Sequence, residues 1–166
     1  MATSLESVLP ALLPKAIGWV NEQSTHILNT GAPLSDVGIR LARAVGVTFP
    51  GKIRVSTVPN LPLPDDPQLR AVALETGLLG EGMIGVTFGY GIYVCAGHVD
   101  NRLVSHECRH VFQYEVAGSI EAFLPVYLGQ IATVGYFDAP LEVDARTHEL
   151  DDYQCDALAV ANFSTI

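Results

Sequence analysis

The chain has 166 residues, of which 49% are hydrophobic and 16% are charged, and its formal net charge at pH 7 is −9. This length and apolar content predict one packed domain over residues 1–166 rather than a disordered chain. The acidic balance argues against nucleic acids and anionic membranes as partners.

Secretion and membrane-insertion signals are weak in this sequence. Glu6, Pro10 and Pro14 interrupt the short N-terminal apolar stretch, which therefore does not resemble a signal peptide. No apolar run reaches the roughly eighteen residues that predict a membrane span. The three cysteines are an odd number without a pairing pattern, which favours free thiols in a reducing compartment. We therefore expect a cytoplasmic protein.

The first half of the chain is predicted to be mostly helical with one strand. Apolar residues at helical spacing, followed by Gly31, predict the first helix, and Ser35 is a suitable N-cap for the second. A cluster of prolines and aspartates predicts a loop before the third helix. The expected elements are helices over 15–29, 36–45 and 68–79, a strand over 52–58 and a loop over 59–67.

Two strands and a long helix are expected next. Residues rich in β-branched and aromatic side chains predict strands over 83–88 and 91–95, with a turn between them at Gly-Tyr-Gly. The segment 101–117 contains no proline or glycine and is predicted to be a helix. Its N-cap is Asp100 or the adjacent asparagine, and glycine at 118 ends it.

Two more helices complete the predicted fold. They are expected over 119–133 and from about Leu141 into the 150s, and a tail is expected from about Ala157. The fold class is therefore α+β: a helix-rich body with a small sheet of few strands, packed on the central helix 101–117.

The motif His-Glu-Cys-Arg-His at 106–110 carries the strongest functional signal. Residues four apart on a helix lie on the same face, so His106 and His110 can bind one metal ion together. Glu107 lies one step round the helix, where its carboxylate can act on a metal-bound water as general base. This arrangement is typical of zinc hydrolases and predicts Zn²⁺ as the cofactor.

The residues around the motif favour a buried helix. Apolar residues cover most of its surface, so its charged and imidazole groups need partners, and a metal supplies them for the histidines. Cys108 occupies a position off the ligand face and is expected to be a small core residue. Arg109 is expected to form an ion pair or cover the helix surface. His26 and His98 are expected to be ordinary histidines rather than ligands.

The sequence over about residues 83–146 resembles the zincin superfamily, in particular small and mostly uncharacterised bacterial metallopeptidases. The resemblance rests on His-Glu-x-x-His-Val-x-Gln-Tyr at 106–114, on Phe123-Leu124 and Tyr127, and on Gly135-Tyr136 before Pro140-Leu141-Glu142. It implies a minimal zincin-like fold with zinc-dependent hydrolysis, and it implies no particular substrate.

A third protein ligand is expected because two histidines hold zinc weakly. Gln113 and Val116 stand where a metzincin needs glycine and histidine, so that subclass is excluded. The gluzincin pattern takes a glutamate from a later helix, and Glu142 fits it. An acidic residue there could also serve only the helix dipole. The competing ligands are Asp144, His148 and Glu149, with Glu115 and Glu121 behind them.

Helix geometry separates Glu142 from two of these competitors. In a helix that starts at Leu141, Asp144 and His148 lie about 200° and 240° round the axis from Glu142. We therefore expect both to face away from the metal.

The predicted activity is hydrolysis of a peptide bond by metal-activated water, with Glu107 as the base. Tyr136, or alternatively Tyr114, could donate a hydrogen bond to the developing oxyanion, although packing explains either tyrosine equally well. The strand before the helix is expected to orient an extended peptide or protein substrate. The alternative is a zinc-binding protein without hydrolytic activity: a pseudo-enzyme, a scaffold or an interaction module of a bacterial complex. The sequence leaves the oligomeric state open.

Overall fold

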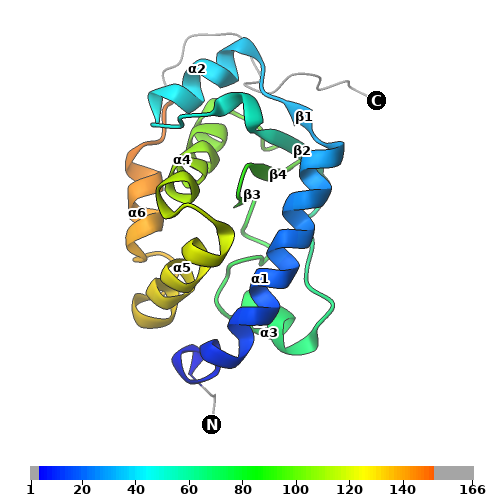
Figure 1. Ribbon diagram of the computed structural model, residues 1–166, viewed down its shortest axis with the longest axis vertical. Helices are drawn as coiled ribbons and strands as arrows, with labels where there is room; N and C mark the ends of the chain where they lie inside the picture. The colour runs from blue at the N-terminus through cyan, green and yellow to red at the C-terminus, as the bar shows by residue number, and fades with distance from the viewer. Residues whose placement is uncertain (1–3, 152–166) are drawn as a thin grey trace.

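The computed structural model of the chain describes residues 4–151 (Figure 1). This part folds into six α-helices, one short 3-10 helix and a four-stranded mixed sheet, which confirms the α+β fold class. In chain order the elements are α1 (Leu5–Thr30), β1 (Ala32–Pro33), α2 (Asp36–Ala44), η1 (Pro50–Lys52), β2 (Arg54–Val58), α3 (Pro67–Glu75), β3 (Gly85–Phe88), β4 (Gly91–Cys95), α4 (Asn101–Ala117), α5 (Ile120–Val134) and α6 (Pro140–Thr147).

The strands lie in the order β1-β2-β4-β3, with β2 and β4 parallel and the two outer pairings antiparallel. β4 leads into α4 and lies inside the sheet, whereas β1 and β3 are its edge strands. Both edges of β4 are paired, so the expectation that the strand directly before the metal helix orients an extended substrate is wrong for β4. The N–H of Cys95 donates to the carbonyl of Ile84, so these two residues form a hydrogen-bonded pair. Hydrogen-bonded and non-hydrogen-bonded pairs alternate along an antiparallel pair of strands, so the backbone groups of Gly85 and Thr87 point away from β4.

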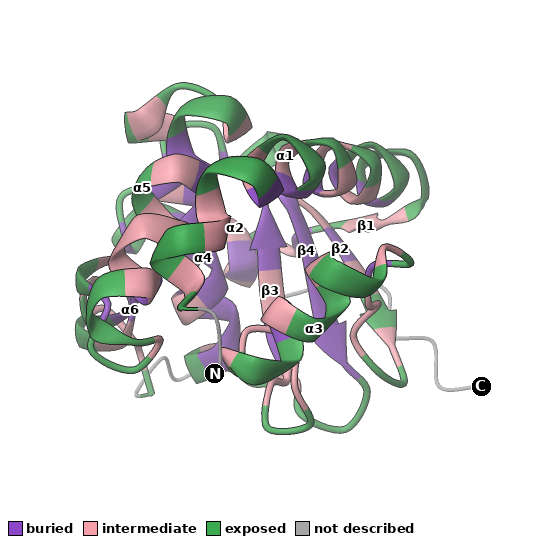
Figure 2. Ribbon diagram, turned by 90° about the horizontal axis from the view of Figure 1, so that it is seen from below, coloured by how far each residue is buried: buried purple, intermediate pink, exposed green. Residues whose placement is uncertain are grey.

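Helices cover both faces of this sheet. Side chains alternate along β4: Ile92 and Val94 pack with residues of α2 and α4, whereas Tyr93 packs with residues of α1. α1 approaches the sheet closely at Gly91, where a Cβ atom would lie 3.0 Å from Ile27. As a result every residue of β4 is buried (Figure 2).

The boundaries of α4 are those predicted from the sequence. The Asp100 side chain is the N-cap and accepts a hydrogen bond from the N–H of Leu103 at 2.7 Å. Gly118 ends the helix in the left-handed region, with φ of +93°. Between these ends, Val104 and Cys108 are buried in the core, which confirms Cys108 as a core residue.

α1 begins at Leu5, well before the predicted start at residue 15. Pro10 and Pro14, which precede the predicted start, lie inside it. The physical reason is the apolar stripe that continues across both prolines, with leucines at 5, 9 and 12 and alanine at 16. Burial of this stripe outweighs the backbone hydrogen bonds that the prolines cannot make.

Other differences from the prediction are small. The two-residue strand β1 and the 3-10 helix η1 were not predicted, and α3 ends at Glu75 rather than at residue 79. α6 ends at Thr147 instead of continuing into the 150s, because the His148 ring turns back to bond the carbonyl of Asp144. The predicted tail from Ala157 lies outside the described residues. Within residues 4–151, every helix is too short or too polar to cross a lipid bilayer.

Candidate metal centre

α4 presents the two histidines of the motif to one another. The Nε2 atoms of His106 and His110 are 3.2 Å apart, and the two rings meet edge to face. His110 is buried, and the His106 side chain is only 13% exposed. This proximity follows from the four-residue spacing on one helix, as the sequence predicts.

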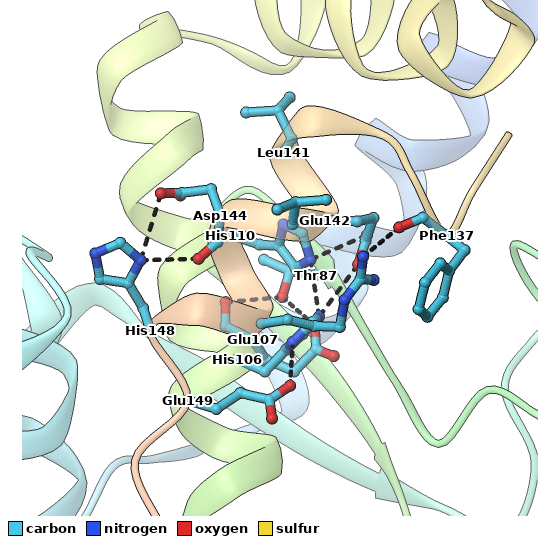
Figure 3. Close-up of polar contacts among 12 residues, drawn as sticks. Thr87, His106, Glu107, His110, Phe137, Leu141, Glu142, Asp144, His148 and Glu149 are labelled. Atoms are coloured by element: carbon cyan, nitrogen blue, oxygen red, sulfur yellow. Dashed lines mark hydrogen bonds and ion pairs between the residues drawn. The ribbon is translucent and has the colours of Figure 1, made fainter. Parts of the chain in front are cut away.

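Glu142 completes this pair from the first turn of α6. One carboxylate oxygen, Oε2, lies 3.3 Å from Nε2 of His106, and the other, Oε1, lies 3.2 Å from Nε2 of His110 (Figure 3). The ligand atoms of the three residues all lie within 4.8 Å of one another. Atoms bound at zinc-ligand distances to one tetrahedral ion lie about 3.3 Å apart. The spacing of the three groups therefore fits a single metal ion.

The outer nitrogen of each imidazole is already engaged. Nδ1 of His110 lies 2.8 Å from Oε1 of Gln113, and Nδ1 of His106 lies 2.9 Å from Oε1 of Glu149. Both oxygens are acceptors, so each Nδ1 carries the proton and donates it. Each Nε2 faces Glu142. Burial opposes protonation of His106, but the hydrogen bond to Glu142 raises the pKa of its imidazole to about 9, so without a metal Nε2 also carries a proton. A metal bound here would displace the Nε2 protons and leave each Nδ1 proton in place, which is the tautomer that metal ligation requires.

The Gln113 amide is held in the orientation that this tautomer needs. Its nitrogen donates to the carbonyl of Leu141 at 2.9 Å and to the Asp144 carboxylate at 2.8 Å. The amide oxygen is thereby left for His110. The same two bonds tie α4 to the first turns of α6.

A bidentate ion pair adds to the attachment of α6. Arg109 donates through Nε and Nη2 to the two oxygens of Asp144, at 2.8 and 3.0 Å. Its Nη1 bonds the carbonyl of Val45, and its guanidinium lies over the Phe112 ring. The ion pair predicted for Arg109 is confirmed. Its structural effect is to set the position of α6, and therefore of Glu142.

Glu142 is an ionised carboxylate in an almost fully buried position, with 1% of its surface exposed. Burial alone would raise the pKa of its carboxyl, but hydrogen bonds from His106 and His110 outweigh this effect and hold that pKa far below its usual value. Tyr127 donates to Oε1 at 2.7 Å. Oε2 is buried without a hydrogen-bond partner within the described part of the chain, as a metal ligand would be before its ion is bound.

Glu107 faces the same region from the other side of His106. Its Oε2 accepts a hydrogen bond from the Thr87 hydroxyl at 2.6 Å, and the same hydroxyl lies 3.1 Å from the Glu107 carbonyl. β3 must approach closely here, because a Cβ on Gly85 would lie 2.7 Å from Oε1 of Glu107. Burial raises the pKa of the Glu107 carboxyl above its usual value, against the opposing effect of the two histidines.

The two tyrosines considered for oxyanion binding differ in how they are placed. Tyr136 lines the same cavity as the histidines, and its pKa is raised by burial and by the negative charge of Glu142. Tyr114 is buried in a stack with Phe123, and its hydroxyl donates to the Thr87 carbonyl at 3.3 Å. Only Tyr136 therefore keeps a hydroxyl that is not used by a strand.

The structure separates Glu142 from its competitors. Asp144 is bound by Arg109 and Gln113, and His148 bonds Asp144, so both face away from the histidine pair as predicted. Glu149 contacts His106 on the Nδ1 side, away from Glu142. The remaining residues also lie elsewhere: Glu115 accepts from the loop at Thr48 and Phe49, Glu121 accepts from Asn21, and His26 and His98 are exposed.

Sequence reasoning missed four supporting residues of this centre. Gln113 carried a usable signal, since it lies three residues after His110 on the same helix face. Glu149 was considered only as a ligand, and its contact depends on where α6 ends. Tyr127 was named only as part of the family resemblance, without a role at the centre, and Thr87 comes from β3, where no local pattern marks it as a partner of Glu107.

Comparisons of this chain with protein-family models, with curated proteins and with solved structures gave no match. The resemblance to zincins therefore rests on the sequence motif. What this geometry establishes is a group of two histidines and one glutamate, His106, His110 and Glu142, that could hold a metal ion.

Proposed function

We propose that this protein is a zinc-dependent, gluzincin-like peptidase, with His106, His110 and Glu142 as zinc ligands and Glu107 as general base. The observation that carries the proposal is the convergence of two Nε2 atoms on a buried carboxylate, at separations of 3.2–3.3 Å. Two imidazoles and one carboxylate are a donor set found in catalytic zinc sites.

The number of ligands supports a catalytic role over a structural one. A structural zinc site is closed by four protein ligands, whereas a catalytic site keeps one position for water or substrate. In residues 4–151 the group contains three ligating side chains. Bound there, zinc would lower the pKa of a water molecule and polarise a substrate carbonyl.

The residues of the chain supply the remaining chemistry. Glu107 would accept a proton from the attacking water and pass it to the leaving nitrogen. The hydrogen bond from Thr87 fixes the orientation of this carboxylate. Tyr136 would donate its hydroxyl proton to the substrate oxygen as negative charge develops on it. The outer edge of β3 would offer the backbone of Gly85 and the N–H of Thr87 to an extended substrate, since the Thr87 carbonyl already accepts from Tyr114.

The test of this proposal is Glu107→Gln, assayed on a broad peptide library together with zinc content. Glutamine is nearly isosteric but accepts no proton, so zinc should stay bound while hydrolysis is lost. The matched control is Glu121→Gln, because Glu121 bonds Asn21 at the surface and should leave activity unchanged. Hydrolysis that persists in Glu107→Gln would remove Glu107 from this role. A wild-type protein that binds zinc but cleaves no peptide would favour the non-hydrolytic alternative.

A further inference from the structure

An apolar cavity adjoins the candidate metal centre. The centre of a water-sized molecule can occupy about 100 Å³ of it, and about 920 Å³ is free of protein atoms when the adjoining open solvent is included. His106, Glu107, His110 and Glu142 line part of its wall, together with all four residues of β3. A group bound in this cavity would therefore be in contact with the proposed reaction site.

One wall of the cavity is a single face of α1. The contributing side chains are spaced along the helix at Leu5, Leu9, Leu12, Ala16, Trp19 and Val20. With a rise of 1.5 Å per residue, the stretch from the first to the last is about 22 Å long. The side chain of one amino acid is much shorter than this wall.

The remaining walls of the cavity are also largely apolar. α3 contributes Leu69, Val72 and Ala73, and α5 contributes Leu124 and Leu128. Among the described residues that line the cavity, none is a lysine or an arginine. The part of the cavity along α1 therefore offers no cation that would favour a negatively charged occupant.

The walls also discriminate between a peptide and a hydrocarbon chain. Apart from the hydrogen bonds that Pro10 and Pro14 cannot make and the groups at the helix ends, the backbone groups of α1 and α3 are bonded within their own helices, so among these elements β3 has the edge for a peptide backbone. A peptide that continued beyond β3 would bury amide groups against aliphatic side chains, and each unpaired amide is costly. A hydrocarbon chain has no such groups.

We propose that the substrate is an amide of a long-chain fatty acid, with its chain along α1 and its carbonyl at the metal centre. This inference rests on the proposed function, since it names the group next to the bond that is cleaved. In the reaction, the water oxygen bonds to the carbonyl carbon as the C–N bond breaks. The nitrogen takes the proton, and a fatty acid and an amine are released.

Trp19 allows binding to be measured without hydrolysis. It is the only tryptophan of the chain, it lines the cavity, and its ring lies 5.4 Å from that of Phe88. Metal-free protein would be titrated with N-acyl glycinamides from butanoyl to tetradecanoyl, with Trp19 fluorescence as the readout. Each added methylene should tighten binding about fourfold until the acyl chain fills the cavity along α1.

A matched pair of variants tests whether the acyl chain of the ligand lies along α1. Ala16 is 6% exposed and lines the cavity, whereas Ala11 on the same helix is exposed and does not line it. Ala16→Phe should weaken binding of the tetradecanoyl compound about tenfold or more, and Ala11→Phe should leave it unchanged. Circular dichroism checks that both variants are folded. If Ala16→Phe does not fold, the chain-length series in the wild-type protein decides alone.

Failure of this inference can be told apart from failure of the proposed function. Affinity that does not change with chain length, or an oligoleucyl glycinamide of matched length that binds as tightly as the tetradecanoyl compound, overturns the fatty-acyl assignment. Peptide hydrolysis that depends on Glu107 would still support the peptidase. Conversely, chain-length-dependent binding without hydrolysis of any bound amide supports the cavity assignment and contradicts the enzyme.

Discussion

Gln113→Leu tests whether the hydrogen bond to Nδ1 of His110 prepares that imidazole for a metal. The Gln113 oxygen accepts this bond at 2.8 Å, and the His110 side chain is only 8% exposed. Leucine has a similar volume but accepts no hydrogen bond, so the buried N–H loses its partner. The proton can then move to Nε2, which removes the lone pair needed for zinc.

The expected loss follows from the structure. Leaving a buried donor unpaired costs about 1–3 kcal/mol. Removing the hydrogen-bond partner of a ligating histidine typically weakens metal binding about 10–100-fold, which corresponds to about 1.4–2.8 kcal/mol. The two ranges agree. We therefore expect the Kd for zinc of Gln113→Leu to rise by about 10–100-fold.

The assay is competition for zinc with a chromophoric chelator at fixed pH. Gln130→Leu is the matched control, because Gln130 also anchors α6, through the N–H of Leu141 at 2.9 Å, but is not among the hydrogen-bond partners of either histidine. It should retain zinc affinity within about threefold. An unchanged Kd in Gln113→Leu, or an equal loss in both variants, would refute the assigned role of the Gln113 side chain.

Three more substitutions test the surroundings of the centre. Glu149→Ala removes the acceptor for Nδ1 of His106 and should weaken zinc binding about tenfold or more in the same competition assay; unaltered affinity would contradict this. Arg109→Met breaks the bidentate pair with Asp144 and should lower the free energy of unfolding in urea by about 1–2 kcal/mol, whereas no change would show that the pair does not anchor α6. Glu115→Gln should lower the free energy of unfolding at pH 7 by about 1 kcal/mol. Burial would raise the pKa of the Glu115 carboxyl, but hydrogen bonds from two backbone amides outweigh it and hold that pKa below its usual value. A carboxyl whose pKa is lower in the folded than in the unfolded state stabilises the protein above the unfolded pKa, and this stabilisation is lost as the pH falls through the folded pKa. The stability difference between wild type and variant should therefore shrink below about pH 4 in urea melts. A difference that does not change with pH would exclude this origin.

The parts of the site that lie on one helix could be predicted from the sequence. The spacing of His106 and His110, the cap at Asp100 and the stop at Gly118 are local signals, and the structure has each of them as expected. Glu142 was predictable for a related reason. It lies in the first turn of a helix that begins at Pro140, and helix geometry turns its nearest competitors away.

The remaining features depend on packing between elements. Tyr127 reaches Glu142 only because α5 lies beside α6, and the sequence marks its segment merely as an apolar helix. The edge position of β3 results from the pairing of β4 with β2, for which no local pattern exists. The predicted start of the first helix at residue 15 was ten residues late, because burial of the leucine stripe continues α1 across Pro10 and Pro14.

The central claim is that His106, His110 and Glu142 bind one zinc ion together, and metal analysis of the purified protein tests it most directly. Protein prepared without chelator, or reloaded with zinc and dialysed, should contain about one zinc per chain. His110→Ala and Glu142→Ala should each lose it, while Glu121→Gln should retain it. A wild-type protein that takes up no zinc, or a Glu142→Ala variant that keeps zinc with unchanged affinity, would contradict the claim.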